Sequence, residues 1–225
     1  MAEELKQFAD ELEPSRDFQA DLQKLIRRVF TEHQRIIFNG NGYDDAWLEE
    51  AKKRGLYNLT STADALPVYT AQKNMDLFIN HGIYTKGEIE ARAEIHIENY
   101  STVLTIEAKT MADMIRHQIL PAVSKYADDL CQRAYHKDAM GVSRQYETST
   151  AKEIAALTDA LQEICAKMET DLDAIPADAT AAMNYCHDVL IPDMAKAREA
   201  ADQLETLTAS DYWPFPVYSD LLFYV

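Results

Sequence analysis

Apolar residues recur at steps of three and four along most of the chain, which is the spacing that places them on one face of an α-helix. A first stretch, residues 2–13, stops at Pro14, whose ring cannot continue a helix. A second stretch, which Ser15 is placed to cap, ends near Gln34. The pattern therefore predicts an all-α chain whose N-terminal part is built from short helices.

Three further short segments follow before the long helices begin. Asp44 or Asp45 is expected to cap a helix that closes just before Gly55, because cations in its last turn and a glycine beyond it are typical of a helix end. Pro67 is expected to break a single helical turn, and Gly82 to stop the helix after it.

The longest helical pattern begins after Thr85, which with Glu88 has the spacing of a capping box. Residues 94–98 alternate with period two, as a strand would, but apolar residues continue at four-residue steps through them. We therefore predict a helix there. Pro121 is expected to kink this helix, and Gly141 to mark its end.

The next stretch carries a heptad-like seam, which predicts a partner helix alongside it at a shallow angle. Pro176 separates it from a last long helix, expected from about Asp178 to Leu207. With the helix before Gly141, these segments are expected to form an antiparallel hairpin or bundle of long helices. The seam consists of Ile154, Leu157, Leu161, Ile164 and Met168.

A short apolar run leads into two Asn-Gly pairs, and we predict a short extended segment and a sharp turn near residues 36–43. Asn-Gly pairs favour positive φ. The turn lacks the third glycine of a dinucleotide-binding loop and the Lys-Ser/Thr of a phosphate-binding loop. We interpret it as a structural turn or a docking loop, formed by Asn39, Gly40, Asn41, Gly42 and Tyr43.

The last fifteen residues lose the helical period and gather aromatic side chains around two prolines. Such a tail is expected to dock, either on its own bundle or on a neighbouring subunit. Its docking candidates are Tyr212, Trp213, Phe215 and Phe223. We expect three regions: linker helices and the Asn-Gly turn in 1–84, a long-helix bundle in 85–210, and the aromatic tail in 211–225.

Charge narrows the classes of partner. The chain has 38 acidic and 22 basic residues, a formal net charge of −16, which disfavours nucleic acid and anionic membranes. Its longest apolar runs are far too short to cross a bilayer, and its first residues do not resemble a signal sequence. We therefore expect a soluble, cytoplasmic protein without nucleic-acid or membrane partners. Three cysteines without a CxxC pair are expected to be buried thiols.

No constellation of residues predicts an active site. The six histidines never show HExxH spacing, and His96 with Glu98 lacks the PCxxC that a zinc deaminase needs. Glu94 and Glu98 lack the ExxH pairs of a di-iron bundle. We therefore assign no catalytic, cofactor-binding or metal-binding residue.

Several segments, in order along the chain, resemble the C-terminal region of type III glutamine synthetases, and the resemblance spans essentially all of the chain. Ser219 departs from the glycine expected there. The segments are Arg35 to Tyr43, Ala65 to Pro67, Glu98 to Ser101 with Ile106 to Ala108, Ile119 to Tyr126, and Tyr212 to Pro216 with Asp220 to Phe223.

The resemblance implies a parent enzyme that joins ammonia to glutamate with ATP and Mg²⁺ or Mn²⁺, through a γ-glutamyl phosphate, and that assembles as stacked rings. The family's catalytic residues lie upstream of this region, so this chain alone is expected to be inactive. Its implied role is structural, with the catalytic domain of the same enzyme and neighbouring ring subunits as partners. The alternative is an independent acidic helical module for protein interaction.

Overall fold

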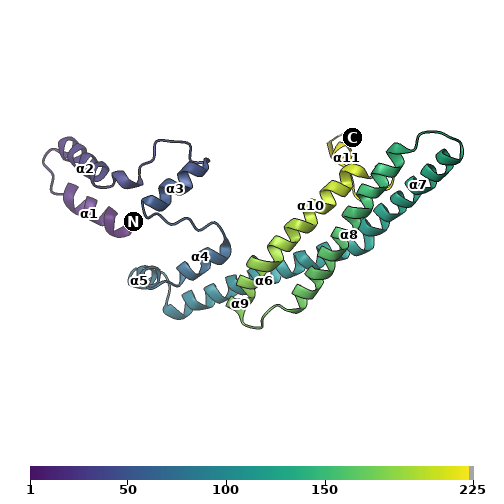
Figure 1. Cartoon of the computed structure of the whole chain (residues 1–225). Coiled ribbons are helices and arrows are strands. Elements are labelled where there is room, and N and C mark those ends of the chain that lie inside the picture. Colours follow the sequence, from purple (N-terminus) through teal and green to yellow (C-terminus); the bar gives the residue numbers. More distant parts are fainter. Residues whose placement is uncertain (223–225) are drawn as a thin grey trace. The chain divides into compact units, whose positions relative to one another are not determined.

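The computed structural model describes residues 1–222, and every regular element among them is a helix (Figure 1). The predicted all-α fold is confirmed. The chain divides into two compact units, Met1–Thr60 and Ser61–Val225.

The first unit begins with a pair of packed helices and ends with a third. Asp17 caps the second helix: its carboxylate accepts from the Ala20 N–H at 3.2 Å. The prediction that Ser15 caps this helix is wrong, because α2 begins at Phe18 and Ser15 lies three residues before it. The Ser15 hydroxyl donates to the Asp21 carboxylate instead, at 2.7 Å. The elements are α1 (Ala2–Leu12), α2 (Phe18–Glu32), the 3-10 turn η1 (Gln34–Ile36) and α3 (Asp45–Lys53).

This unit buries little apolar surface. Of its side chains that the structure describes, only Leu25 and Ala51 are buried. Large apolar side chains are exposed on α2, on the segment after it and on α3, so this unit presents faces that a partner can cover. They include Phe18, Ile26, Phe30, Ile36, Ile37 and Leu48.

The second unit is a bundle of three long helical rods (Figure 1). The first rod runs from α6 through a π-helical turn into α7, α8 returns antiparallel to it, and α9 continues through a second π-helical turn into α10. The predicted bundle of long antiparallel helices is confirmed. The elements are α4 (Thr62–Tyr69), α5 (Gln72–Asn80), α6 (Lys86–Met114), η2 (Ile115–Ile119), α7 (Leu120–Ala139), α8 (Gln145–Asp173), α9 (Ala179–Tyr185), η3 (Cys186–Leu190), α10 (Ile191–Leu207) and α11 (Tyr218–Leu222).

The capping box at the start of α6 is present: Thr85 Oγ1 accepts from the Glu88 N–H, and the Glu88 carboxylate accepts from the Thr85 N–H. The helix continues through residues 94–98, as predicted. The break expected at Pro67 is wrong, since α4 runs on to Tyr69. Ser61 caps α4, and it accepts from the Asp64 N–H at 3.1 Å.

The heptad-like seam of α8 forms the centre of the bundle. Ile154, Leu161 and Met168 are completely buried, and Leu157 and Ile164 are partly buried against the same cluster. Around this seam the other two rods contribute mainly small and branched side chains, which let helices approach closely. These are Ala108, Ile115 and Val123 from the first rod, and Leu190, Ala197 and Leu204 from the third.

Pro121, which is expected to kink its helix, and Pro192 each follow a π-helical turn. The residue before Pro121 donates its N–H to the Ile115 carbonyl, and the residue before Pro192 donates to the Cys186 carbonyl, each five residues back. A proline lacks an N–H and crowds the carbonyl four residues earlier, and the π turn changes the local spacing where that crowding falls. The rods therefore continue through both prolines.

The tail after α10 corrects another expectation. The last fifteen residues are expected to lack helical structure, whereas the last described segment, Tyr218–Leu222, is a short helix. Phe223, one of the four aromatic docking candidates, lies outside the described residues.

Candidate docking sites

The Asn-Gly loop between η1 and α3 is tied down at its base. Arg54 donates to the carbonyls of Arg35 and Ile37, and its Nε donates to Glu50 at 2.7 Å. The Phe38 ring lies 4.5 Å from the Trp47 ring, centroid to centroid. These contacts hold both ends of the loop against α3.

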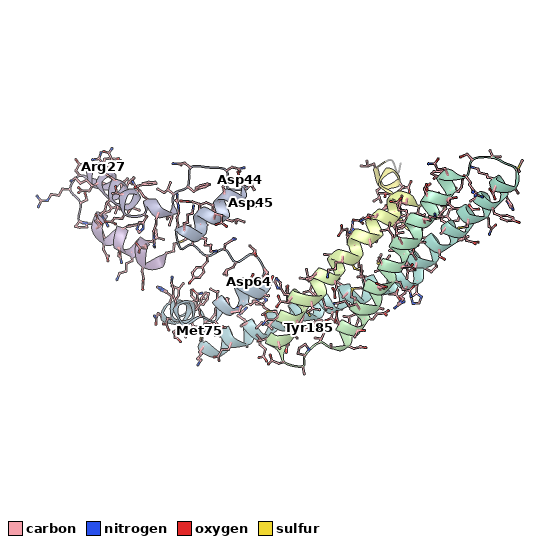
Figure 2. All side chains as sticks on the ribbon, viewed as in Figure 1. Arg27, Asp44, Asp45, Asp64, Met75 and Tyr185 are labelled. Carbon is pink, nitrogen blue, oxygen red and sulfur yellow. The ribbon has the colours of Figure 1, made fainter. Side chains whose placement is uncertain are left out.

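The tip of the loop is exposed. Asn41 Oδ1 accepts from the Tyr43 N–H at 3.1 Å, and Asp44, at the start of α3 (Figure 2), accepts from the Ala46 N–H. The Tyr43 side chain is 100% exposed. Asn39, Gly40, Asn41 and Gly42 are exposed as well. The structure thus places all five predicted loop residues at the surface.

The positive φ expected for this loop is wrong. Positive φ occurs at Gly55, Gly82 and Gly141, each just past a helix end, and not at Gly40 or Gly42. Gly40 instead leaves space for a neighbouring ring: a Cβ there would lie 2.7 Å from Cε1 of Phe38, too close for a real contact. A larger residue at this position would have to displace the Phe38 ring.

The aromatic tail docks on its own bundle. The Tyr212 ring lies 5.0 Å from the Tyr126 ring, centroid to centroid, and its hydroxyl donates to Asp129 at 3.1 Å. Lys125 Nζ lies 5.8 Å from the centre of the same ring. Burial raises the pKa of Tyr126 to about 12. The sequence left open where the tail docks, and for Tyr212 the answer is α7.

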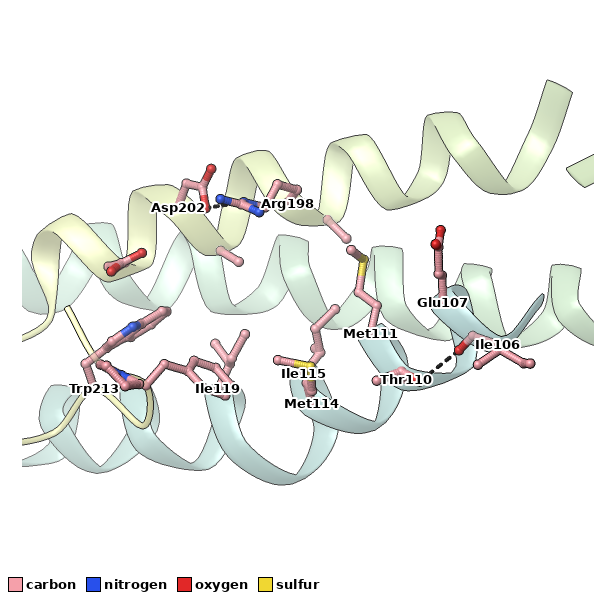
Figure 3. A pocket seen from close by; sticks show the side chains of 15 residues that line it. Ile106, Glu107, Thr110, Met111, Met114, Ile115, Ile119, Arg198, Asp202 and Trp213 are labelled. Carbon is pink, nitrogen blue, oxygen red and sulfur yellow. Dashed lines mark hydrogen bonds and ion pairs between the residues drawn. The ribbon is translucent and has the colours of Figure 1, made fainter. Parts of the chain in front are cut away.

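Trp213 and Phe215 close one end of a groove between the first and third rods. Their rings meet edge to face at 6.1 Å. Figure 3 shows Met111, Ile115 and Ile119 along one wall and Trp213 at the end. The groove encloses about 470 Å³, a size typical of binding pockets.

Carboxylates stand on the rim of this groove. Glu107 from α6 and Glu205 from α10 line it, and neither takes part in an ion pair within residues 1–222. Arg198 also lines it but pairs with Asp202 one turn along α10. The groove therefore combines apolar walls with a net negative rim.

Ion pairs brace the bundle elsewhere. Arg116 makes two hydrogen bonds to Glu169, at 2.9 and 2.6 Å, which join η2 to α8 and lower the pKa of that carboxyl. Lys167 on α8 pairs with the buried Asp193 of α10 and with Asp171, which also accepts from the Tyr185 hydroxyl. These contacts fix how the three rods pack.

The described residues offer no ligand set for a metal ion: no three His, Cys, Asp or Glu side chains among them gather closely enough. No helix in the described part of the chain has both the length and the apolar character needed to cross a membrane.

Sequence reasoning singles out the loop and the tail as docking candidates, but it misses the groove. The helical pattern indicates a core position for Met111, Ile115 and Ile119, and it does not single out Ile106 as an exposed apolar residue. Ile106 is 58% exposed and lies off the main stripe of α6. The signal in the sequence that could have indicated the groove is therefore an apolar residue away from that stripe.

Comparisons with known proteins show which family the chain belongs to. Residues 21–138 match the glutamine synthetase C-terminal domain family. A glutamine synthetase of Butyrivibrio fibrisolvens is 34% identical over 212 residues, which cover 90% of this chain and 29% of that protein. A type-3 glutamine synthetase of Dictyostelium discoideum is 31% identical over 217 residues, covering 91% and 29%.

A glutamine synthetase of Bacteroides fragilis (strain YCH46) is 25% identical over 235 residues, which cover 99% of this chain and 32% of that protein. The chain thus spans less than a third of the length of these curated relatives. The family match covers more than half of the chain. The resemblance identified from the sequence is confirmed, and the chain belongs to the glutamine synthetase C-terminal domain family.

Proposed function

We propose that the chain is the structural and assembly region of a type III glutamine synthetase. In this proposal its helices pack against the catalytic domain of the same enzyme and against neighbouring subunits of a ring. The parent reaction is the ATP-dependent ligation of ammonia to glutamate, with Mg²⁺ or Mn²⁺ bound in the catalytic domain, and the enzyme works in the cytoplasm. This chain supplies none of the reacting groups.

The observation that carries the proposal is that residues 1–60 bury very few side chains. A unit of this size is marginally stable even with a good core, and here only Leu25 and Ala51 are buried among its described side chains. Its curated relatives are much longer than this chain. A further domain that covers the exposed apolar side chains of α2 would supply the missing burial.

The test mixes the purified chain with a synthetase core that lacks this region, and follows particle size and glutamine formation together. We expect larger particles and a gain in glutamine formation over the core alone. A folded chain that neither binds the core nor changes its activity would contradict the proposal and favour the independent interaction module.

A further inference from the structure

We propose that the groove between the first and third rods binds a small apolar molecule that carries one cationic group. The cation lies beside Glu205 and Trp213, and the apolar part of the molecule runs along Met111 and Ile115. The inference goes beyond the proposed function, because it concerns only the bundle of the second unit and holds whether or not the chain packs against a catalytic domain.

The walls of the groove are apolar and adaptable. Ile115 and Ile119 of the first rod line one wall, together with Met111 and Met114. The facing wall on α10 presents small side chains such as Ala201, which leave a space of about 470 Å³ between the rods. Methionine side chains are flexible and fill irregular gaps. The groove can therefore take up an apolar group without a rearrangement of the rods.

One end of the groove is closed, which favours a small molecule over a helix of another protein. Trp213 lies at the Ile119 end (Figure 3), and its ring meets that of Phe215 edge to face at 6.1 Å. A docking helix anchors itself at successive turns and needs an open path along its groove. A space of about 470 Å³ with a closed end instead matches the pockets that enclose small ligands.

The carboxylate of Glu205 lies at this closed end. In Figure 3, α10 runs from Arg198 through Asp202 towards the end that Trp213 closes. Glu205 follows Asp202 by three residues, about one turn further in the same direction. After α10 the chain reverses sharply, because the Trp213 N–H donates to the Ala209 carbonyl at 3.1 Å. Glu205 and Trp213 therefore line the same end of the groove.

The closed end favours a cationic group. Glu205 forms no ion pair among the side chains that the structure describes, whereas Asp202 pairs with Arg198 at 2.5 Å. Glu205 is also only partly exposed, and opposite charges attract each other more strongly where water is partly excluded. An aromatic ring such as that of Trp213 adds to the attraction, because the face of the ring is electron-rich.

The charge of the chain disfavours an anionic ligand. The chain carries a net charge of −16, and a carboxylate or phosphate group at the closed end would face Glu205. Glu107 lies at the opposite end of the groove, near Ile106 (Figure 3), and is exposed, so water weakens its attraction for a cation. One cationic group at the Glu205 end is therefore the ligand chemistry that fits the groove.

The test compares three probes that share an eight-carbon chain: the cation octyltrimethylammonium, neutral 1-octanol and anionic octanoate. The full chain carries Trp47→Phe, so that Trp213 is its remaining tryptophan and the emission of Trp213 reports binding at the closed end. We expect the cation to bind at least about tenfold more tightly than 1-octanol, and octanoate to bind more weakly than either.

Two conservative variants locate the cation. Glu205→Gln should weaken binding of octyltrimethylammonium about tenfold and leave binding of 1-octanol unchanged, because only the charge is removed. Glu107→Gln is the matched control at the opposite end, and it should change neither. A third variant, Ala201→Leu, fills part of the groove and should weaken binding of both probes. Circular dichroism checks that each variant keeps its helices.

Three results would each overturn the proposal. In the first, octyltrimethylammonium binds no more tightly than 1-octanol. In the second, Glu107→Gln weakens its binding as much as Glu205→Gln does. In the third, no probe changes the Trp213 emission at concentrations up to about 10 mM. None of these results bears on whether the chain binds a synthetase core, so the two proposals fail separately.

Discussion

The hydroxyl of Tyr212 donates a hydrogen bond to the carboxylate of Asp129, 83 residues earlier in the chain, at a distance of 3.1 Å. The contact fastens the start of the aromatic tail to α7. It also fixes where the chain turns towards Trp213 and Phe215, which close the groove. One hydrogen bond on α7 therefore helps to shape a surface between α6 and α10.

Replacing Tyr212 separates the two parts of this contact. Tyr212→Phe keeps the ring but removes the hydrogen bond, and we expect a loss of about 1 kcal/mol in the free energy of unfolding. Tyr212→Ala also removes the packing against Tyr126, which adds a similar amount. Urea denaturation measures both. Equal losses for the two variants would show that the ring contributes nothing.

Local signals in the sequence predict much of the fold. The capping box at Thr85 and the glycines Gly55, Gly82 and Gly141 mark helix ends because their chemistry acts within a few residues. The groove could not be predicted in the same way. Its walls come from α6 and α10, far apart in the chain, and depend on how far two helices diverge. The π turns before Pro121 and Pro192 likewise lack a simple sequence signature.

The bidentate pair between Arg116 and Glu169 should make stability depend on pH. The arginine lowers the pKa of the Glu169 carboxyl in the folded chain, so the pair contributes stability above the unfolded pKa of about 4.3 and loses it as pH falls through the folded pKa. Because both side chains are partly exposed, we expect only about 1 kcal/mol at neutral pH.

The measurement compares the wild-type chain with Glu169→Gln from pH 7 down to pH 3. The difference in unfolding free energy should be constant near neutral pH and shrink below about pH 4.5. A double-mutant cycle with Arg116→Gln isolates the pair from the other carboxyls. A coupling energy that does not change with pH would contradict this account.

Glu147 is 5% exposed, and its pairing with Lys137 lowers the pKa of its carboxyl. Its second oxygen has no hydrogen-bond partner among the residues that the structure describes. Lys137→Met should therefore destabilise the chain, since a carboxylate that is mostly covered loses its partner.

The double variant Lys137→Met with Glu147→Leu should recover most of the stability lost by Lys137→Met alone, because apolar side chains can replace the pair without a desolvation cost. Thermal unfolding followed by circular dichroism compares the three proteins. A double variant less stable than Lys137→Met alone would show that the charges are needed for packing.

The cysteines differ in exposure, which corrects the expectation that all three are buried. Cys131 is exposed on α7, whereas Cys165 and Cys186 are buried, and burial raises the pKa of both of their thiols. We expect one thiol per chain to react quickly with a disulfide reagent and two to react only on opening of the fold. Cys131→Ser should remove the fast phase and leave the slow one unchanged.

Gly40 and Gly42 lie in the same loop but differ in the space around them. A Cβ at Gly40 would lie 2.7 Å from Cε1 of the Phe38 ring, whereas a Cβ at Gly42 would meet nothing within 4 Å, and neither residue has positive φ. Gly40→Ala should therefore displace the Phe38 ring from Trp47 and cost about 1 kcal/mol of local stability, the worth of an aromatic pair. Gly42→Ala should be neutral or slightly stabilising, because it restricts the unfolded chain. Fluorescence of Trp47, measured in a Trp213→Phe background, reports the ring displacement directly. If both alanine variants shifted the emission equally, the loop would depend on backbone freedom at both glycines and not on the space beneath one aromatic ring.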